Sequence, residues 1–550
     1  MKRDCNPQPL FVITQEARKI DTLFYNGLIR SMDEAGTCYE AIGITGDKIT
    51  FLGSNEEAAA LEAENRIDLN GTVLMPSFNE GHMHLSNYAF VNCNVPLFHC
   101  TSVEECIAEA RNYLQEHPDA KWMYCRGFNE DNFTGEKRYP TKQELDAISD
   151  QIPILFVRVC GHVAVTNTPA LTEIMKLEQA AALTNEIIEE DGRLYEGACP
   201  LFYLILEKPD QEYIKNLLRF GMKELNKCGI TICQPDDFKS VPGADWRDIM
   251  GAYKSLEAEG EMTVRIYQQC LFERFCDYEE FLEAGHKTGQ GGDFYKVGPL
   301  KLLLDGSLGA KTAALTAPYE GTEDEYGITI FTQEELDQFV ITAQKNHTQV
   351  AVHCIGDKAM EMCIEAYKKA NEVYPLEDMR HGIVHVQITT EHVIDEMAAN
   401  GIVAYIQPVF VDYDMDIAEK CVGPDRVQHT YAWKKLIDKG VLCVGGSDAP
   451  VESFDILDNI YYAVTREKLK GGPEGGWLPQ YKLPVDEAVR LFTSYAAKSC
   501  FAEDKVGMLK VGMLADLVVL EEDLYAVEPH HIKDVKVLRT VCGGKTVYEA

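Results

Sequence analysis

Eight short apolar runs, each followed by a longer amphipathic stretch, constrain this chain more than any other feature of its sequence. Short strands that alternate with helical stretches predict repeated βα units and a parallel sheet. Eight such units are the number found in a (β/α)₈ barrel. The runs begin at Thr72, Gly229, Thr263, Gly298, Thr348, Gly382, Gly401 and Gly440.

Both ends of the chain predict β-structure instead. Residues 20–69 and 505–550 contain short strand-like runs separated by turn residues. We therefore expect an α/β fold with a small β-sandwich domain built from residues 1–71 and 505–550, and a barrel over residues 72–504. About 150 residues separate the first run from the second, too many for an ordinary βα connection. An insertion over about 95–225 is expected after the first barrel strand.

Composition limits the partners and the compartment. The chain has 88 acidic and 52 basic residues, a formal net charge of −36, so nucleic acid and anionic membranes would be repelled. No apolar stretch is long enough to cross a bilayer, and polar residues and prolines interrupt residues 1–19 where an export signal would lie. The 18 cysteines show no CxxC pair, which is typical of a reduced, cytoplasmic protein. A small-molecule partner is expected.

Metal-ligand residues follow several of the apolar runs. His82 and His84 are two positions apart, so in an extended strand both side chains face the same way and can bind one ion. His353, His385 and Asp448 stand at the ends of three further predicted strands, where barrel active sites are built. A single such residue is more often a core residue or a helix cap. Placement of all of them on one barrel rim favours a metal centre.

Lys301 is a charged residue inside an otherwise apolar predicted strand, where a buried ammonium is costly. Two interpretations are open. In the first, Lys301 forms a buried ion pair with Asp305. In the second, its amine takes up carbon dioxide and becomes a carbamate, an anionic ligand that bridges two metal ions.

These motifs together resemble the amidohydrolase superfamily, and most closely its N-substituted formamide deformylase-like branch. The resemblance extends from about Ile20 to Tyr548. It rests on the histidine pair, on residues 301–315, 352–357, 381–387 and 445–451, and on the C-terminal residues 507–520. Residues 76–81 depart from the family pattern, which has Gly before Phe78 and Asp-Ala or similar before the histidines, but the metal ligands are intact.

The resemblance implies a role for each ligand. His82 and His84, with Asp448, would hold the more buried metal, and a carbamylated Lys301 would bridge to a second metal held by His353 and His385. Zinc is the first expectation for these ligands, although iron, manganese and cobalt suit the same set. Asp448 is the expected general base and general acid for water attack on a carbonyl.

Substrate contacts are expected from the insertion and from the strand end that carries Lys301. Asn129 and His162 lie in segments that resemble substrate-facing parts of this branch, and Asp305 follows Lys301 on the same strand end. Asn129 is otherwise an ordinary turn residue and His162 a hydrogen-bonding core residue. His381 directly precedes the strand of His385 and is a candidate to support it.

The predicted function is metal-dependent hydrolysis of a non-peptide C–N bond of the amide or formamide type. The sequence does not specify the oligomeric state, although a homodimer is common among such barrels. One alternative is a mononuclear zinc deaminase of a heterocycle, which would not need Lys301. A second alternative is an inactive barrel that acts as a binding scaffold. The substrate itself is not encoded in the fold or the metal site.

Overall fold

The computed structural model describes residues 20–550, and it divides into two compact units. The first unit comprises residues up to His84, Met222–Asp237 and Leu256–Ala550. The second comprises Leu85–Gly221 and Phe238–Ser255. The export signal considered above falls on residues 1–19, outside the described part of the chain.

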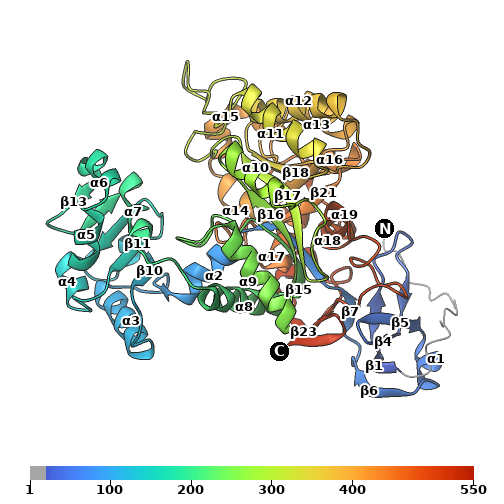
Figure 1. Cartoon of the computed structure of the whole chain (residues 1–550). Coiled ribbons are helices and arrows are strands. Elements are labelled where there is room, and N and C mark those ends of the chain that lie inside the picture. Colours follow the sequence, from blue (N-terminus) through green and yellow to red (C-terminus); the bar gives the residue numbers. More distant parts are fainter. Residues whose placement is uncertain (1–19) are drawn as a thin grey trace. The chain divides into compact units, whose positions relative to one another are not determined.

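An eight-stranded parallel sheet forms the centre of the first unit, with α10 to α13 along the outside of its strands (Figure 1). Its hydrogen-bonded order is β21-β20-β19-β18-β17-β16-β15-β8. The strands are β8 (Phe78–Met83), β15 (Ile230–Pro235), β16 (Arg265–Leu271), β17 (Tyr295–Leu303), β18 (Val350–Cys354), β19 (Gly382–His385), β20 (Val403–Ile406) and β21 (Cys443–Gly445).

The sheet curls into a nearly closed barrel because its first and last strands meet. The Asp448 N–H donates to the His82 carbonyl at 2.8 Å, and the His84 N–H donates to the Ala449 carbonyl at 2.7 Å. These bonds lie directly after β21, at the C-terminal end of β8. The predicted barrel is therefore confirmed in its main feature.

One predicted strand was wrong. The run that begins at Thr72 gives β7 (Val73–Pro76), which pairs with β2 and β22 in another sheet, and the first barrel strand is β8. Asn79, Glu80 and His82 make β8 look like a polar loop in the sequence, yet every residue of the strand is buried. Glu80 Oε1 and His82 Nδ1 have hydrogen-bond partners in the interior, whereas the buried Glu80 Oε2 and His82 Nε2 have none among the described residues.

Helices connect the barrel strands or follow the last of them, and some begin at a capping side chain. They are α10 (Phe275–Glu283), α11 (Gln333–Lys345), α12 (Asp357–Val373), α13 (Glu391–Ala399), α16 (Trp433–Asp438), α17 (Ile456–Thr465), α18 (Val485–Leu491) and α19 (Ser494–Ser499). A capping box of Thr332 and Glu335 begins α11, and Thr390 caps α13.

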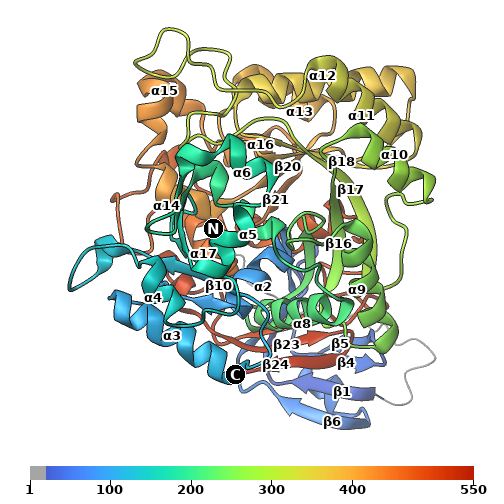
Figure 2. The ribbon, with the colours of Figure 1, turned by 60° about the vertical axis from the view of Figure 1, so that its left-hand side comes forward.

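The two ends of the chain lie together, as the blue and red strands of Figures 1 and 2 show. One sheet has the order β5-β4-β1-β6, and the other has the order β24-β23-β22-β7-β2-β3. Apolar residues of both sheets, including Phe24, Ile44, Leu74 and Val519, form one buried cluster. The strands are β1 (Ile20–Tyr25), β2 (Leu28–Arg30), β3 (Cys38–Tyr39), β4 (Ala41–Thr45), β5 (Lys48–Gly53), β6 (Ala63–Asp68), β22 (Leu517–Leu520), β23 (Val537–Cys542) and β24 (Lys545–Glu549).

The second unit has a six-stranded sheet of its own, in the order β13-β14-β12-β11-β10-β9. Helix α3 (Val103–Glu116) packs on it through a core that includes Cys106, Phe128 and Phe156. Its strands are β9 (Val95–Pro96), β10 (Met123–Phe128), β11 (Ile154–Arg158), β12 (Val163–Thr166), β13 (Ile187–Ile188) and β14 (Arg193–Tyr195).

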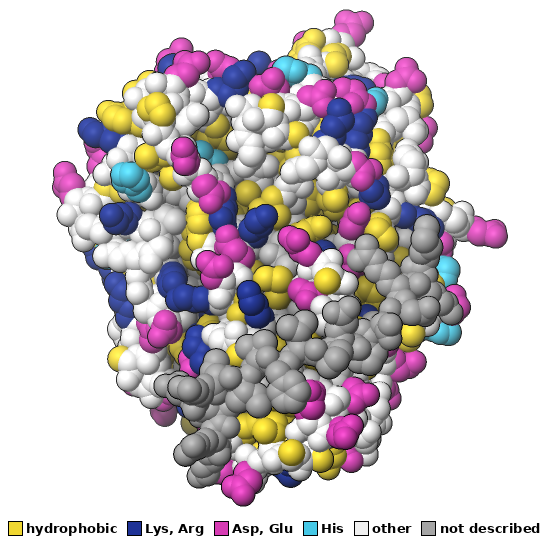
Figure 3. Space-filling view, turned by 90° about the vertical axis from the view of Figure 1, so that its right-hand side faces the viewer, with side chains coloured by type: hydrophobic (Ala, Val, Ile, Leu, Met, Phe, Trp, Pro, Cys, Tyr) yellow, Lys and Arg dark blue, Asp and Glu magenta, His cyan; other side chains and the backbone are white. Residues whose placement is uncertain are grey.

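Other global features agree with the composition. Within residues 20–550, no helix is long and apolar enough to cross a membrane, and the 17 cysteines of this range are all free thiols. Acidic and basic side chains are interspersed on the face shown in Figure 3.

Candidate metal centre

Six predicted ligand residues come together at the C-terminal ends of the barrel strands. His82 lies in β8, with His84 directly after it, Lys301 in β17, His353 in β18 and His385 at the end of β19, while Asp448 follows β21. The rings of His82 and His385 have centroids 5.8 Å apart, and those of His353 and His385 are 4.4 Å apart. Charge from Lys301 reaches His82, His84 and His385.

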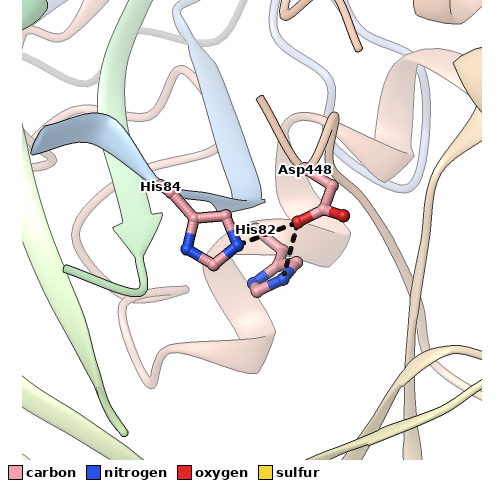
Figure 4. A group of neighbouring side chains, drawn as sticks. All are labelled: His82, His84 and Asp448. Carbon is pink, nitrogen blue, oxygen red and sulfur yellow. Dashed lines mark ion pairs between the residues drawn. The ribbon is translucent and has the colours of Figure 1, made fainter. Parts of the chain in front are cut away.

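His82, His84 and Asp448 form the tightest part of this group (Figure 4). The Nε2 atoms of the two histidines are 3.3 and 3.2 Å from Asp448 Oδ1. The potential ligand atoms of the three residues lie within 4.8 Å of one another. Two imidazole nitrogens and a carboxylate oxygen at this spacing are a ligand set that divalent transition metals accept.

All four histidines are held with Nδ1 against an acceptor. His82 Nδ1 is 3.0 Å from Gln269 Oε1, and His84 Nδ1 is 2.8 Å from the Asp236 carbonyl. His353 Nδ1 is 3.0 Å from Asp305 Oδ1. His385 Nδ1 is 2.8 Å from Gln407 Oε1. An Nδ1 that donates leaves Nε2 as the metal-binding atom, which is the usual arrangement of metal-ligating histidines.

The glutamines are themselves oriented by backbone groups. Gln269 Nε2 donates to the carbonyls of Gly81 and Gln234, at 3.2 and 3.0 Å. Gln407 Nε2 donates to the Tyr405 carbonyl at 3.3 Å. Each amide oxygen therefore faces its histidine as an acceptor, and the tautomer of the histidine follows.

Burial and charge separate the pKa values of the ligands. Burial and the Lys301 charge lower the pKa of His82 to about 4. Burial alone would also lower the pKa of His84, but Asp448 raises it to about 9. Burial would raise the pKa of Asp448, yet hydrogen bonds from the two histidines bring it well below its usual range. A proton on His84 thus occupies the position that a cation would take, which fits a metal site.

The backbone at two of the ligands is strained. His385 has φ 82°, its neighbour Val386 has φ 50°, and Asp448 has φ 61°. Such angles are uncommon for residues other than glycine, and a β-branched valine rarely adopts them. Strain of this kind persists where the surrounding structure enforces it, and it clusters at functional sites.

Lys301 has a different partner from the one proposed in its ion-pair interpretation. Its Nζ lies 3.7 Å from Asp236 Oδ2, and both side chains are about 99% buried. Asp305 instead accepts hydrogen bonds from the backbone N–H groups of Ala314, Ile355 and Gly356, besides its contact with His353. The pairing of Lys301 with Asp305 was therefore wrong, and Asp236 is a site residue that the sequence reasoning missed.

Glu80 is a further buried carboxyl that the sequence reasoning did not assign to the site. Its Oε1 accepts from the N–H groups of His82 and Ser447, at 3.1 and 2.8 Å, and so joins β8 to the segment after β21. Burial raises the pKa of Glu80 to about 8. The family pattern has an Asp shortly before the two histidines, close to the position of Glu80. This acid is the sequence signal that could have identified Glu80.

The remaining candidates are not among the six ligand residues. Asn129 and His162 belong to the second unit. There Asn129 caps a short 3₁₀ helix, and His162 is mostly exposed, with Nδ1 2.9 Å from Glu196 Oε2. Substrate contact by Asn129, His162 and Asp305 stays a prediction. His381 is buried, and its ring nitrogens bond to the Val350 N–H and to Gln344 Oε1. Neither bond involves a ligand histidine.

Comparisons with known proteins relate the chain to named hydrolases. A protein of Bacillus subtilis (strain 168) named as an amidohydrolase, YtcJ, is 29% identical over 96% of this chain and 99% of its own length. An N-substituted formamide deformylase of Arthrobacter pascens is 23% identical over 96% of this chain and 98% of its own. The crystal structure of a metal-dependent hydrolase from Pyrococcus furiosus, itself uncharacterized, has the same fold, with a TM-score of 0.77 and 23% identity over 92% of this chain and 99% of its own.

The family assignment rests on a match to the sequence model of the amidohydrolase family. This sequence model matches residues 66–548, which include the barrel, the insertion and the C-terminal strands. The chain therefore belongs to the amidohydrolase family and is a hydrolase that acts on carbon–nitrogen bonds.

Proposed function

We propose that this enzyme hydrolyses a non-peptide amide or formamide bond with two divalent cations, zinc first among them. The observation that carries the proposal is the set of four histidines, each with Nδ1 bound to an acceptor, around Asp448 and Lys301. His82, His84 and Asp448 would hold one cation, and His353 and His385 the other. The resemblance to an N-substituted formamide deformylase supports a formamide-type substrate.

Lys301 is the residue that distinguishes one cation from two. As a carbamate it would bridge the cations: the neutral amine adds to carbon dioxide, a C–N bond forms, and one proton is released. As an ammonium it would stay paired with Asp236, 3.7 Å away. An ion pair between Lys301 and Asp236 leaves no bridging carbamate, so this contact is the observation that favours the alternative function, a mononuclear deaminase.

The protein's own part in the reaction is proton transfer and orientation. Cations held here would supply Lewis-acid activation of a shared water and of the substrate carbonyl. Asp448 Oδ1 faces His82 and His84, so its other oxygen, Oδ2, is the one we assign to the proton of the attacking water. Asp448 then returns this proton to the nitrogen as the C–N bond breaks, which yields an acid and an amine.

Metal content tests the proposal directly. We would purify the wild type, Lys301→Ala and Lys296→Ala with added zinc and ¹³C-bicarbonate, then measure metal per chain and record a ¹³C spectrum. Lys296 is a matched control because it lies in the same strand, β17, outside the ligand group. We expect two ions per chain and a carbamate signal in the wild type and in Lys296→Ala. In Lys301→Ala we expect one ion or none and no carbamate signal.

Each other outcome points to an alternative. One ion in all three proteins contradicts the bridge and favours the mononuclear deaminase. No metal in any of them favours an inactive scaffold. A panel of N-formyl, N-acyl and cyclic amides beside an aminated heterocycle then decides which bond is cleaved, since turnover of the heterocycle alone would contradict amide hydrolysis.

Several finer features belong to the same proposal. We propose that the two terminal sheets form a β-sandwich, with domain boundaries near residues 71 and 504 and an insertion over about 95–225. A homodimer and a cytoplasmic location remain predictions, and light scattering of the purified protein measures the first.

A further inference from the structure

Arg126 is a partly buried arginine of the second unit whose guanidinium has no hydrogen bond or ion pair with any residue of the described range 20–550. This is unusual in a chain with 88 acidic residues. A cation taken partly out of water is costly unless a counter-charge approaches it. The side chain is therefore placed to receive a charge that the protein itself does not supply.

Other arginines of the same sheet show the contrast. Arg158, in the neighbouring strand β11, bonds to Glu130 and Asp131. Arg193, in β14, pairs with Asp191. The unit thus pairs these guanidinium groups with its own carboxylates and leaves Arg126 unpaired.

Two tyrosines lie near Arg126, of which Tyr124 is buried and Tyr203 is half-buried. Tyr124 precedes it by two positions in β10, so both side chains leave the strand on the same face. The ring of Tyr203 is 5.9 Å from that of Tyr124. Burial and Tyr124 raise the pKa of Tyr203, and the positive charge of Arg126 opposes this rise, which places all three groups close together.

Space beside the guanidinium is bounded by a glycine. A Cβ built on Gly161 would lie 3.7 Å from an Arg126 terminal nitrogen, an ordinary van der Waals distance, and no other atom would be within 4 Å of it. Gly161 has φ 79°, so a side chain is disfavoured at the position that faces Arg126. The loop of Gly161 thus leaves the arginine accessible.

We propose that Arg126 binds the carboxylate of a small organic acid whose apolar body lies against the ring of Tyr203, which the buried ring of Tyr124 supports. The planar guanidinium can bond both oxygens of a carboxylate. A single cation in an acidic chain balances one negative charge, which favours a carboxylate over a phosphate dianion. This inference does not depend on the proposed amide hydrolysis.

Benzoate is the probe, titrated by calorimetry into the full-length protein, both chelator-treated and zinc-loaded. We expect saturable binding in both forms and at least about tenfold weaker binding by Arg126→Gln. Arg193→Gln, which removes a paired arginine of the same sheet, should bind as the wild type does. Benzamide and inorganic phosphate should bind much more weakly than benzoate.

Three results would overturn the proposal: undiminished benzoate affinity in Arg126→Gln, binding that requires zinc, and preference for phosphate. A second measurement avoids dependence on the folding of the variant. Phenylglyoxal modifies accessible arginines, and peptide mass spectrometry reports the rate at each. Benzoate should slow modification of Arg126 and not of Arg193 in the wild type, and equal rates with and without benzoate would contradict the site.

Discussion

At the residue scale, the barrel interior is organised around fixed hydrogen-bond acceptors. Gln269, Asp305 and Gln407 each face the Nδ1 of one ligand histidine and are held in turn by backbone groups. Such supporting partners commonly change metal affinity by about 10- to 100-fold when they are removed. The histidines are therefore oriented before any ion binds.

Asp305→Asn is expected to weaken metal binding at His353 by about 10- to 100-fold, because the amide can present N–H groups where the carboxylate accepts them. Competition with a chromogenic chelator measures this. Asp357→Asn is the matched control, since Asp357 is also buried and accepts from the Thr316 N–H at 3.0 Å without contacting a ligand histidine. Equal affinity in the two variants would show that Asp305 does not support the site.

Asp414 gives a pH-dependent prediction. Burial raises its pKa from 3.8 to about 6 although Tyr431 donates a hydrogen bond to it. The folded state therefore favours the protonated carboxyl, so stability is highest below about pH 4 for this group and falls as pH rises through 6. Asp414→Asn should gain up to about 3 kcal/mol over the wild type at pH 8 and little at pH 4.

Urea unfolding of both proteins between pH 4 and pH 8 checks the sign of this effect. Glu452 feels the charge of Asp414, and its pKa is raised to about 7 by burial and neighbouring acids. Glu452→Gln alone is therefore the control for coupling between the two carboxyls. The same stability difference at both ends of the pH range would refute the assignment to Asp414.

The ligand residues predicted from the sequence are those whose chemistry stands out locally, and their role as ligands stays a prediction. A histidine or aspartate at the end of an apolar run can be found without a structure, and all six predicted ligands lie together. Asp236 follows β15 in the same way, so the same signal was present there. Gln269, in β16, and Gln407, directly after β20, carry no such signal, because a neutral amide reveals its function only through the histidine it faces.

At the element scale, the seam between β8 and the segment after β21 carries His82, His84 and Asp448. A Cβ built on Gly446 would lie 2.6 Å from the His82 nitrogen and 2.9 Å from Glu80 Oε1. Neither neighbour can move freely, since both belong to the seam. The close approach of these two segments thus depends on glycine.

Gly446→Ala is expected to cost about 1–3 kcal/mol of unfolding free energy and to reduce metal content, because the added methyl group pushes Asp448 away from the histidines. Thermal unfolding of the metal-free protein and metal analysis give the two readouts. Gly135→Ala is the control, since its Cβ would meet no atom within 4 Å. A variant as stable and as metal-rich as this control would contradict the steric role of the seam.

The same seam shows why the first strand was misassigned. The run at Thr72 is apolar and forms a real strand, β7, but this strand belongs to the terminal sheet. The barrel strand that follows carries the polar residues Asn79, Glu80 and His82, so it does not appear as one of the apolar runs. Apolar periodicity detects a strand that faces a core, and it misses one whose side chains build a site.

At the scale of the whole molecule, the division into units could be predicted only in outline. The interval between the first two apolar runs was too long for a connection, which indicated an insertion. Its own sheet could not be inferred, because β9 and β13 have two residues each. Such short strands are defined by their pairing with β10 and β14 and leave little pattern in the sequence.

The terminal sheets are tied to the barrel by a buried ion pair. Arg265, in barrel strand β16, donates from Nε to Asp516 Oδ2 at 2.7 Å, and Asp516 also accepts from the Gly543 N–H at 2.7 Å. The Asp516 side chain is 2% exposed and that of Arg265 is 11% exposed. Removal of one partner from such a pair leaves a buried charge without compensation, which costs about 3–5 kcal/mol.

Asp516→Ala should therefore lower the unfolding free energy by about that amount, while Arg265→Met with Asp516→Ala should recover part of the loss because no charge is left unpaired. Denaturant unfolding of the two variants and the wild type measures both effects. If the single variant unfolds at the same denaturant concentration as the wild type, the ion pair does not hold the terminal strands on the barrel. If the double variant is less stable than Asp516→Ala, the ion pair contributes more to the unfolding free energy than its burial costs. Both ends of the chain then depend on this pair for their place beside β16.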